Sequence, residues 1–85
     1  MKIIYSPKFI RQFKKLIPSL QEEILEKIEL FKLEKNHKVL RVHKLHGDLK
    51  GSLSFSVNYQ YRIVFEYVDD KKISFLAIGD HDIYK

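Results

Sequence analysis

The sequence predicts an α+β fold in which an N-terminal strand and an α-helical hairpin precede a three-stranded antiparallel meander that forms a curved sheet. Two patterns support this prediction. Apolar residues recur every three or four positions before residue 31, and every second position after residue 51. The length of 85 residues and the apolar share of 45% are enough for one modest core. We therefore expect a single domain over residues 1–85, with helices on one face of the sheet.

A short strand and a first helix are expected at the N-terminus. Residues 2–5 alternate weakly between polar and apolar, and Ser6 and Pro7 then supply the cap and the first turn that open many helices. Pro18 is expected to end this helix, because proline cannot continue the hydrogen-bond ladder. The apolar face of the helix is marked by residues three or four positions apart: Phe9, Phe13 and Leu16, flanked by Ile10 and Ile17.

A second helix is expected to begin directly after Pro18, so that the two helices form an antiparallel hairpin. The segment Ser19-Leu20-Gln21-Glu22 has the form of a capping box, in which the Glu22 carboxylate reaches back to the Ser19 amide. The buried stripe of this helix is predicted to be Leu20, Ile24, Ile28 and Phe31.

Three strands are predicted beyond Gly51. In the first, apolar residues that face the core alternate with serines that face the other side. After a turn at 58–60, residues 61–68 are apolar on both faces except at Arg62 and Glu66, as expected for a central strand. Residues 73–79 form the last strand, which a polar tail follows. The core-facing residues of the first of these strands are predicted to be Leu53, Phe55 and Val57.

The segment between the helices and these strands, residues 35–50, shows no regular period apart from a brief extended piece expected at 39–42. We interpret this segment as a functional loop. It is basic, and twelve of the sixteen Lys and Arg residues lie in the first fifty positions of a chain with a formal net charge of +5. Such a surface attracts RNA, DNA or an acidic protein, although a solvated lysine-rich surface would have the same composition.

Composition also bounds the cellular location. The chain has no cysteine, so neither a disulfide framework nor a thiolate metal site is expected, and a reducing compartment is indicated. Neither a signal peptide nor an apolar run long enough to cross a bilayer is visible in the sequence. We therefore expect a cytoplasmic protein without a membrane partner.

Four short motifs occur in an order that is typical of one toxin family. Together with the predicted elements, they resemble the RelE/ParE superfamily of toxins from type II toxin-antitoxin modules, and within it the RelE and YafQ branches. The resemblance covers nearly the whole chain. The motifs are Lys44-Leu45-His46-Gly47, Lys50-Gly51, Tyr61-Arg62-Ile63-Val64-Phe65 and Ile78-Gly79-Asp80-His81-Asp82-Ile83-Tyr84.

The resemblance implies a RelE-like fold and a cognate antitoxin protein as partner. It also implies a metal-independent endoribonuclease, an mRNA interferase that inhibits translation by cleaving mRNA on the ribosome. The ribosome and mRNA are then further partners, and no small-molecule cofactor is expected. The reaction needs a base for a ribose 2′-hydroxyl, positive charge for the phosphate oxygens, and an acid for the leaving 5′ oxygen.

The resemblance also implies catalytic roles for Arg62, His81, Tyr84 and His43. Arg62 matches the family's strand arginine, and its guanidinium fork suits two phosphate oxygens. A structural ion pair of Arg62 with Glu66 or a C-terminal acid is the alternative. His81 and His43 match histidines of the YafQ branch, which can exchange a proton near neutrality. Tyr84 matches a C-terminal aromatic that stacks on a base or orients the phosphate, although Tyr84 as an anchor of the tail and His81 as a turn residue are equally open readings.

Residues expected to bind RNA are Lys44, Lys50, His46, Ser54 and Ser56. A bound metal is not expected, because the histidines at 37, 43 and 46 lack a fourth ligand. Ser54 and Ser56 depart from the family, since they occupy the side of the strand where RelE-type toxins carry lysines and YafQ-type toxins a histidine. This departure keeps two alternatives open: a ParE-like non-enzymatic inhibitor of DNA gyrase, and a catalytically decayed toxin that retains antitoxin binding.

Overall fold

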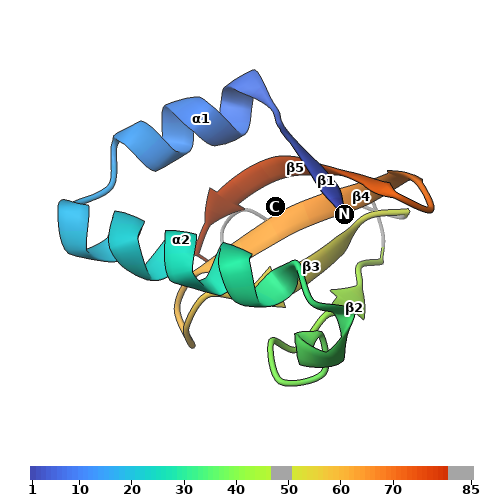
Figure 1. The fold of residues 1–85 in the computed structure, drawn as a ribbon. Helices are drawn as coiled ribbons and strands as arrows, with labels where there is room; N and C mark the ends of the chain where they lie inside the picture. The colour runs from blue at the N-terminus through green and yellow to red at the C-terminus, as the bar shows by residue number, and fades with distance from the viewer. Residues whose placement is uncertain (47–50, 81–85) are drawn as a thin grey trace.

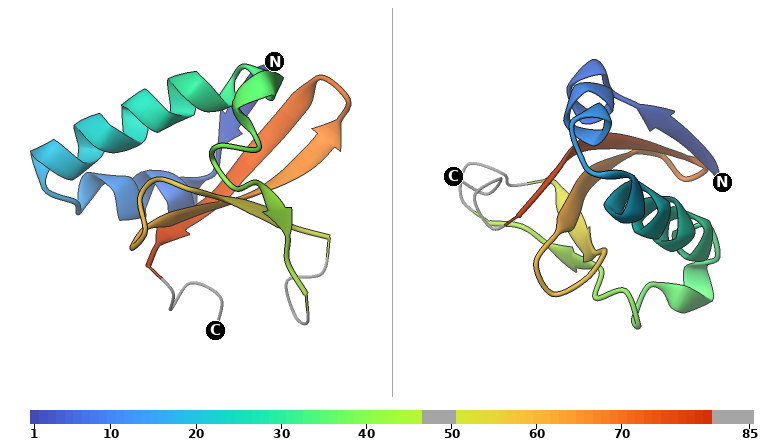
Figure 2. Two further views of the ribbon diagram at one scale, coloured as in Figure 1. Left: turned by 90° about the horizontal axis from the view of Figure 1, so that it is seen from below. Right: turned by 90° about the vertical axis from the view of Figure 1, so that its left-hand side faces the viewer.

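A computed structural model of the chain describes residues 1–46 and 51–80, and it confirms the α+β fold (Figure 1). Two helices pack on one side of a five-stranded sheet, as both views of Figure 2 show. The elements are, in chain order, β1 (Lys2–Tyr5), α1 (Pro7–Lys14), α2 (Pro18–Phe31), the short 3-10 helix η1 (Glu34–Asn36), β2 (His43–Lys44), β3 (Leu53–Ser56), β4 (Arg62–Asp69) and β5 (Lys72–Gly79).

The strands follow the order β1-β5-β4-β3-β2 across the sheet. The predicted meander is confirmed, because β3, β4 and β5 pair antiparallel to their neighbours, while β1 adds to β5 in parallel. The expected extended piece at 39–42 is wrong, since residues 37–41 form turns and the strand of this loop is β2, one residue further along. β2 pairs with β3 and thereby places His43 on the edge of the sheet.

The start of α1 agrees with the sequence prediction, whereas the start of α2 does not. The Ser6 hydroxyl accepts a hydrogen bond from the Phe9 amide at 3.0 Å, as an N-cap does. α1 already ends at Lys14, and Pro18 is the first residue of α2 rather than the terminator of α1. Proline has no amide hydrogen, and an amide in the first helical turn has no hydrogen-bond acceptor within the helix. Pro18 therefore loses no hydrogen bond at this position.

The predicted capping box of α2 is also wrong. Ile17 is the N-cap residue, and no side chain caps this helix. The amides of Leu20 and Gln21 both donate to the Ile17 carbonyl, at 3.1 and 3.0 Å, so the helix has begun before Ser19. Ile17 has the extended backbone that a residue before proline favours, and this local preference outweighs the cap that Ser19 would provide.

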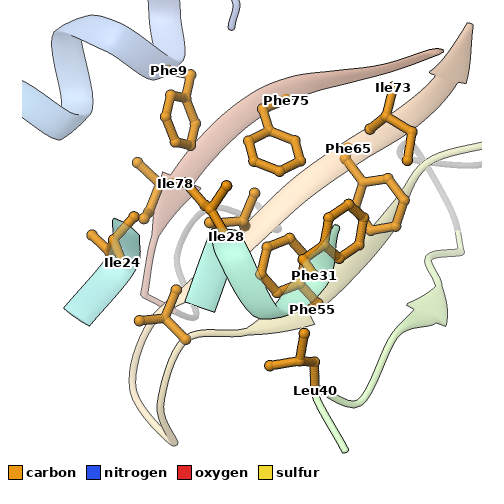
Figure 3. Packing of buried hydrophobic residues seen from close by; sticks show 12 residues of the cluster. Phe9, Ile24, Ile28, Phe31, Leu40, Phe55, Phe65, Ile73, Phe75 and Ile78 are labelled. Atoms are coloured by element: carbon orange, nitrogen blue, oxygen red, sulfur yellow. The ribbon is translucent and has the colours of Figure 1, made fainter. Parts of the chain in front are cut away.

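A cluster of phenylalanine rings holds the helices on the sheet (Figure 3). Phe31 of α2 stacks on Phe55 of β3 with ring centroids 4.4 Å apart, and Phe75 of β5 lies 5.6 Å from both Phe31 and Phe9. The predicted stripe of α2 is confirmed, because Ile24, Ile28 and Phe31 are buried and Leu20 packs against them. Within residues 1–46 and 51–80, no helix is long and apolar enough to span a membrane.

The predicted facing of β3 is confirmed as well. Phe55 and Val57 are buried in this cluster, and Leu53 packs against it. The serines of the same strand therefore lie on the sheet face opposite the helices. That face positions the candidate site.

Candidate active site

Strand pairing brings two of the predicted catalytic residues onto the sheet face opposite the helices. His43 of β2 pairs with Ser54 of β3, and Arg62 of β4 pairs with Ser56 of β3. Directly paired residues share a face, and Ser54 and Ser56 also share one because they are two positions apart. His43 and Arg62 thus lie two strands apart across the sheet and two residues apart along it. Ideal sheet spacings then place their Cα atoms roughly 12 Å from each other. Side chains of their lengths can approach a phosphodiester from two sides.

The His43 ring is exposed, and its hydrogen bonds indicate which nitrogen carries the proton. Nδ1 lies 2.8 Å from the backbone carbonyl oxygen of Arg41, which can only accept a hydrogen bond. Nδ1 therefore holds the hydrogen in the neutral ring, and the lone pair is on Nε2. Nε2 lies 3.4 Å from the Ser54 hydroxyl oxygen, a long contact that leaves the nitrogen weakly engaged. This arrangement makes Nε2 a proton acceptor.

The turn that orients His43 is strained at Arg41. Arg41 has a φ of 59°, in the left-handed region that residues other than glycine rarely adopt. Two backbone hydrogen bonds close the turn around it, from the Arg41 amide to the Lys38 carbonyl and from the Val42 amide to the His37 carbonyl. The turn aims the Arg41 carbonyl at His43. Backbone strain of this kind persists where surrounding contacts enforce it, and it gathers at functional sites.

The Arg62 guanidinium is half-buried and is held by backbone rather than by an acid. Its Nη1 donates to the Asn58 carbonyl at 2.7 Å and to the Tyr61 carbonyl at 3.3 Å. The alternative of an ion pair with Glu66 is not found, because the Glu66 carboxylate instead accepts a bond from the Ser52 hydroxyl at 2.9 Å. Arg62 forms no ion pair within the described residues, and the C-terminal acid Asp82, part of the other alternative, lies outside them.

Asn58 fixes the turn from which Arg62 is held. The Asn58 side-chain oxygen accepts hydrogen bonds from the amides of Gln60 and Tyr61, at 2.9 and 2.8 Å. Its side-chain nitrogen donates to the Glu23 carboxylate of α2 at 2.7 Å. The turn is therefore tied to a helix, which keeps the guanidinium in place before any ligand binds.

The two serines of β3 differ in their exposure. Ser54 is completely buried, and its side chain lies beside the His43 ring. The predicted contacts of both serines with RNA stay predictions. Ser56 is half-buried next to Arg62, and its amide donates to the Leu40 carbonyl at 2.8 Å. Local alternation could not distinguish these two serines, because their burial depends on segments distant in the chain.

Lys44, the last residue of β2, and His46, two residues further on, are exposed, so both can contact a polyanion. His37 has a structural role, because its ring stacks on Phe31 at 4.5 Å and its Nε2 lies 2.8 Å from the Phe31 carbonyl. Three or more potential metal ligands do not gather anywhere in the part of the chain that the structure describes. The predicted site residues Lys50, His81 and Tyr84 lie outside the described residues, so their roles stay predictions.

A hollow of about 240 Å³ lies beside Arg62, and it was not predicted from the sequence. Lys27 of α2, Arg41 and Tyr59 line it together with Ser56 and Arg62. These residues come from a helix, a loop, a turn and two strands, and their convergence depends on the tertiary fold. A tyrosine within a polar turn was the only local signal that could have pointed to the hollow.

Two helices on one side of a five-stranded sheet are the fold of the RelE-like toxins. Residues 5–81 match the family model described as HigB-like toxin, a RelE-like toxin of type II toxin-antitoxin system HigB. Because the match spans most of the chain, the protein belongs to the HigB-like toxin family. Toxin HigB-1 of Vibrio cholerae serotype O1 is 32% identical to it over 82 residues, which cover 81% of this chain and 86% of that toxin.

Solved structures confirm the fold. The YoeB-YefM complex from Staphylococcus aureus superposes with a TM-score of 0.73 at 22% identity, covering 95% of this chain and 97% of that chain. HP0894 from Helicobacter pylori gives a TM-score of 0.73 at 21% identity, covering 96% of both chains. A YafQ mutant from E. coli gives 0.68 at 21% identity, covering 96% of this chain and 94% of that chain. Together with the family match, these structures confirm the predicted resemblance to the RelE-like toxins.

Proposed function

We propose that this type II toxin is a metal-independent endoribonuclease that cleaves mRNA on the ribosome and so inhibits translation. The observation that carries the proposal is the placement of a proton acceptor, His43 Nε2, and a guanidinium held by backbone carbonyls, that of Arg62, on one face of the sheet. RNA itself supplies the nucleophile, so the protein needs only to move protons and stabilise charge.

The proposed reaction uses these groups in sequence. His43 Nε2 accepts the proton of a ribose 2′-hydroxyl, and the oxygen attacks the adjacent phosphorus. The Arg62 guanidinium donates to the non-bridging oxygens as their negative charge grows. The bond to the 5′ oxygen then breaks, and that oxygen takes a proton from an acid, for which we propose His81. The products are a 2′,3′-cyclic phosphate and a 5′-hydroxyl. Tyr84 is proposed to orient the phosphate, and Lys44, Lys50 and His46 to contact the RNA backbone.

The departure at Ser54 and Ser56 does not argue against a nuclease in this account. His43 on the neighbouring strand supplies the base that β3 lacks, and it pairs directly with Ser54. The match to a HigB-like, RelE-like family also favours the nuclease over the gyrase-type and decayed alternatives.

Purified protein with programmed ribosomes tests this assignment against its alternatives. We expect the protein to cleave mRNA bound to ribosomes, to leave the same free mRNA intact, and to leave DNA supercoiling by gyrase unchanged. Inhibited supercoiling without mRNA cleavage would establish the gyrase-type reading instead. A folded protein that affects neither process would be the decayed toxin.

Members of type II modules are neutralised by an antitoxin, and the matched YoeB-YefM and RelBE2 structures are complexes of this kind. We propose that the antitoxin of this protein covers the apolar groove between α1 and α2. The groove has a volume of about 310 Å³ and is lined by Tyr5, Phe9, Ile10, Phe13, Lys14, Leu25 and Ile28. Leu25 is 53% exposed and Ile10 is 40% exposed. These two apolar side chains of the helices are therefore accessible to a partner.

Charge identifies the chemistry of the segment that would fill this groove. α1 carries Lys8, Arg11 and Lys14 and no acid, so its side of the groove is positive, whereas α2 carries four glutamates and one lysine. An antitoxin helix or strand with apolar side chains on one face and carboxylates flanking them complements this surface.

Leu25→Glu is expected to weaken antitoxin binding about 30-fold, the effect of losing one interface residue worth about 2 kcal/mol. Toxicity without antitoxin should be unchanged, because Leu25 lies on the helical side, away from His43 and Arg62. Calorimetric titration of antitoxin into the variant measures the effect. Val68→Glu is the matched control, since Val68 is 56% exposed on β4 and outside the groove. Equal antitoxin affinity of the parent and Leu25→Glu would disprove this docking site.

A further inference from the structure

We propose that the hollow beside Arg62 is a nucleotide subsite of the nuclease, in which Lys27 and Arg41 hold the RNA phosphate next to the cleaved one and Tyr59 stacks on its base. This inference rests on the proposed function and specifies where the substrate continues beyond the catalytic groups. The hollow has a volume of about 240 Å³, which suits a sugar and a phosphate. It is bounded by α2, the turn before β2, and the turn between β3 and β4.

Hydrogen bonds within the protein hold the walls of the hollow in place. The Ser56 amide binds the Leu40 carbonyl and ties the loop wall to β3, at 2.8 Å. Asn58 joins the turn wall to α2 through Glu23, at 2.7 Å. A ligand therefore meets a preformed cavity, and little binding free energy is lost in ordering it.

The hollow is strongly positive. Lys27, Arg41 and Arg62 all line it, and among the described residues that line it there is no carboxylate. Glu23 lies one helical turn before Lys27 but binds Asn58 instead, and none of the three cations forms an ion pair within residues 1–46 and 51–80. Three cations around one small cavity attract a phosphate group, and the Arg62 that lines it also belongs to the catalytic pair. A phosphate bound here would thus be the neighbour of the cleaved phosphate along the RNA chain.

Tyr59 favours RNA over an acidic protein as the occupant. Its side chain is 90% exposed at the lip of the hollow, in a turn that is otherwise polar. In the described part of the chain, no other ring packs against it. An exposed aromatic ring beside a phosphate-binding cavity is the arrangement by which proteins bind single-stranded RNA, with the base stacked on the ring and the backbone on the cations.

Binding of a short fluorescent single-stranded RNA by the full-length toxin tests the subsite, with 2′-deoxyribose at the cleavage position to prevent turnover. Tyr59→Ala should weaken binding roughly 5-fold to 150-fold, whereas Tyr59→Phe should bind like the parent. Lys27→Gln and Arg41→Asn should each weaken binding and lower the slope of log K against log salt by about 0.7. Asparagine is chosen at position 41 because it tolerates the left-handed backbone there. Tyr67→Ala, near the other end of β4, and Lys71→Gln, in the turn that follows β4, serve as matched controls.

The same variants are then assayed for ribosome-bound cleavage, where a subsite role predicts a raised KM with little change in kcat. If the Lys27, Arg41 and Tyr59 variants bind RNA and cleave like the parent while Arg62→Ala does not cleave, the subsite is wrong and the nuclease stands. If only antitoxin affinity falls, the hollow belongs to an acidic protein segment and the subsite is equally wrong. Parental cleavage by folded Arg62→Ala would instead overturn the proposed function itself.

Discussion

Arg62→Ala is expected to slow mRNA cleavage about 100-fold to 1000-fold, the usual effect of removing one preorganised donor to a charged transition state. The guanidinium is preorganised because two carbonyls, those of Asn58 and Tyr61, hold its Nη1. Its remaining N–H groups can then meet the phosphate oxygens without a change in side-chain conformation. The rate of cleavage on programmed ribosomes measures the effect, and circular dichroism checks that the variant is folded.

Arg62→Lys is the informative companion variant. Lysine retains the charge but lacks the planar fork, so an intermediate loss is expected if two oxygens are bound at once. The assignment of Arg62 fails if the folded alanine variant remains as active and as toxic as the parent.

His43→Ala should lower the cleavage rate about 100-fold to 10,000-fold, the range that proton transfer by a positioned side chain usually contributes. The reason is the bond between Nδ1 and the Arg41 carbonyl, which leaves Nε2 as the acceptor. The rate of cleavage on programmed ribosomes measures the effect, and circular dichroism checks that the variant is folded.

Added imidazole provides the control for this second prediction. It should restore part of the activity of His43→Ala, because a small base can occupy the space of the exposed ring, and it should leave Arg62→Ala unchanged. Full activity of folded His43→Ala without imidazole would mean that another group, such as His81, is the base.

Local patterns predicted the elements that bury one face. The apolar stripe from Leu20 to Phe31 repeats over several helical turns, and the alternation around Phe55 repeats along its strand. The local sequence of each element therefore shows which of its faces is buried. The start of α2 was mispredicted because two local signals competed. The proline at 18 determined the conformation of Ile17, and the cap at Ser19 was left inside the helix.

The site was less predictable, because its geometry arises from long-range pairing. Arg62 and His43 were found by resemblance, but nothing near His43 in the sequence shows that β2 would pair with β3 and place the ring over Ser54. The left-handed backbone of Arg41 was equally hidden, since an arginine carries no preference for that conformation. The contribution of Lys27 to the hollow depends on the packing of α2 against a distant turn, to which Glu23 is joined through Asn58, 35 residues further along the chain.

Attack by the ribose 2′-hydroxyl is tested by cleavage of two mRNAs on programmed ribosomes, one natural and one lacking the 2′-hydroxyl at the mapped cleavage site. We expect the natural mRNA to be cut to a 2′,3′-cyclic phosphate and a 5′-hydroxyl, and the deoxy substrate to stay intact at that bond. Cleavage of the deoxy substrate there, or products with a 3′-hydroxyl and a 5′-phosphate, would show attack by water and contradict the roles assigned to His43 and Arg62.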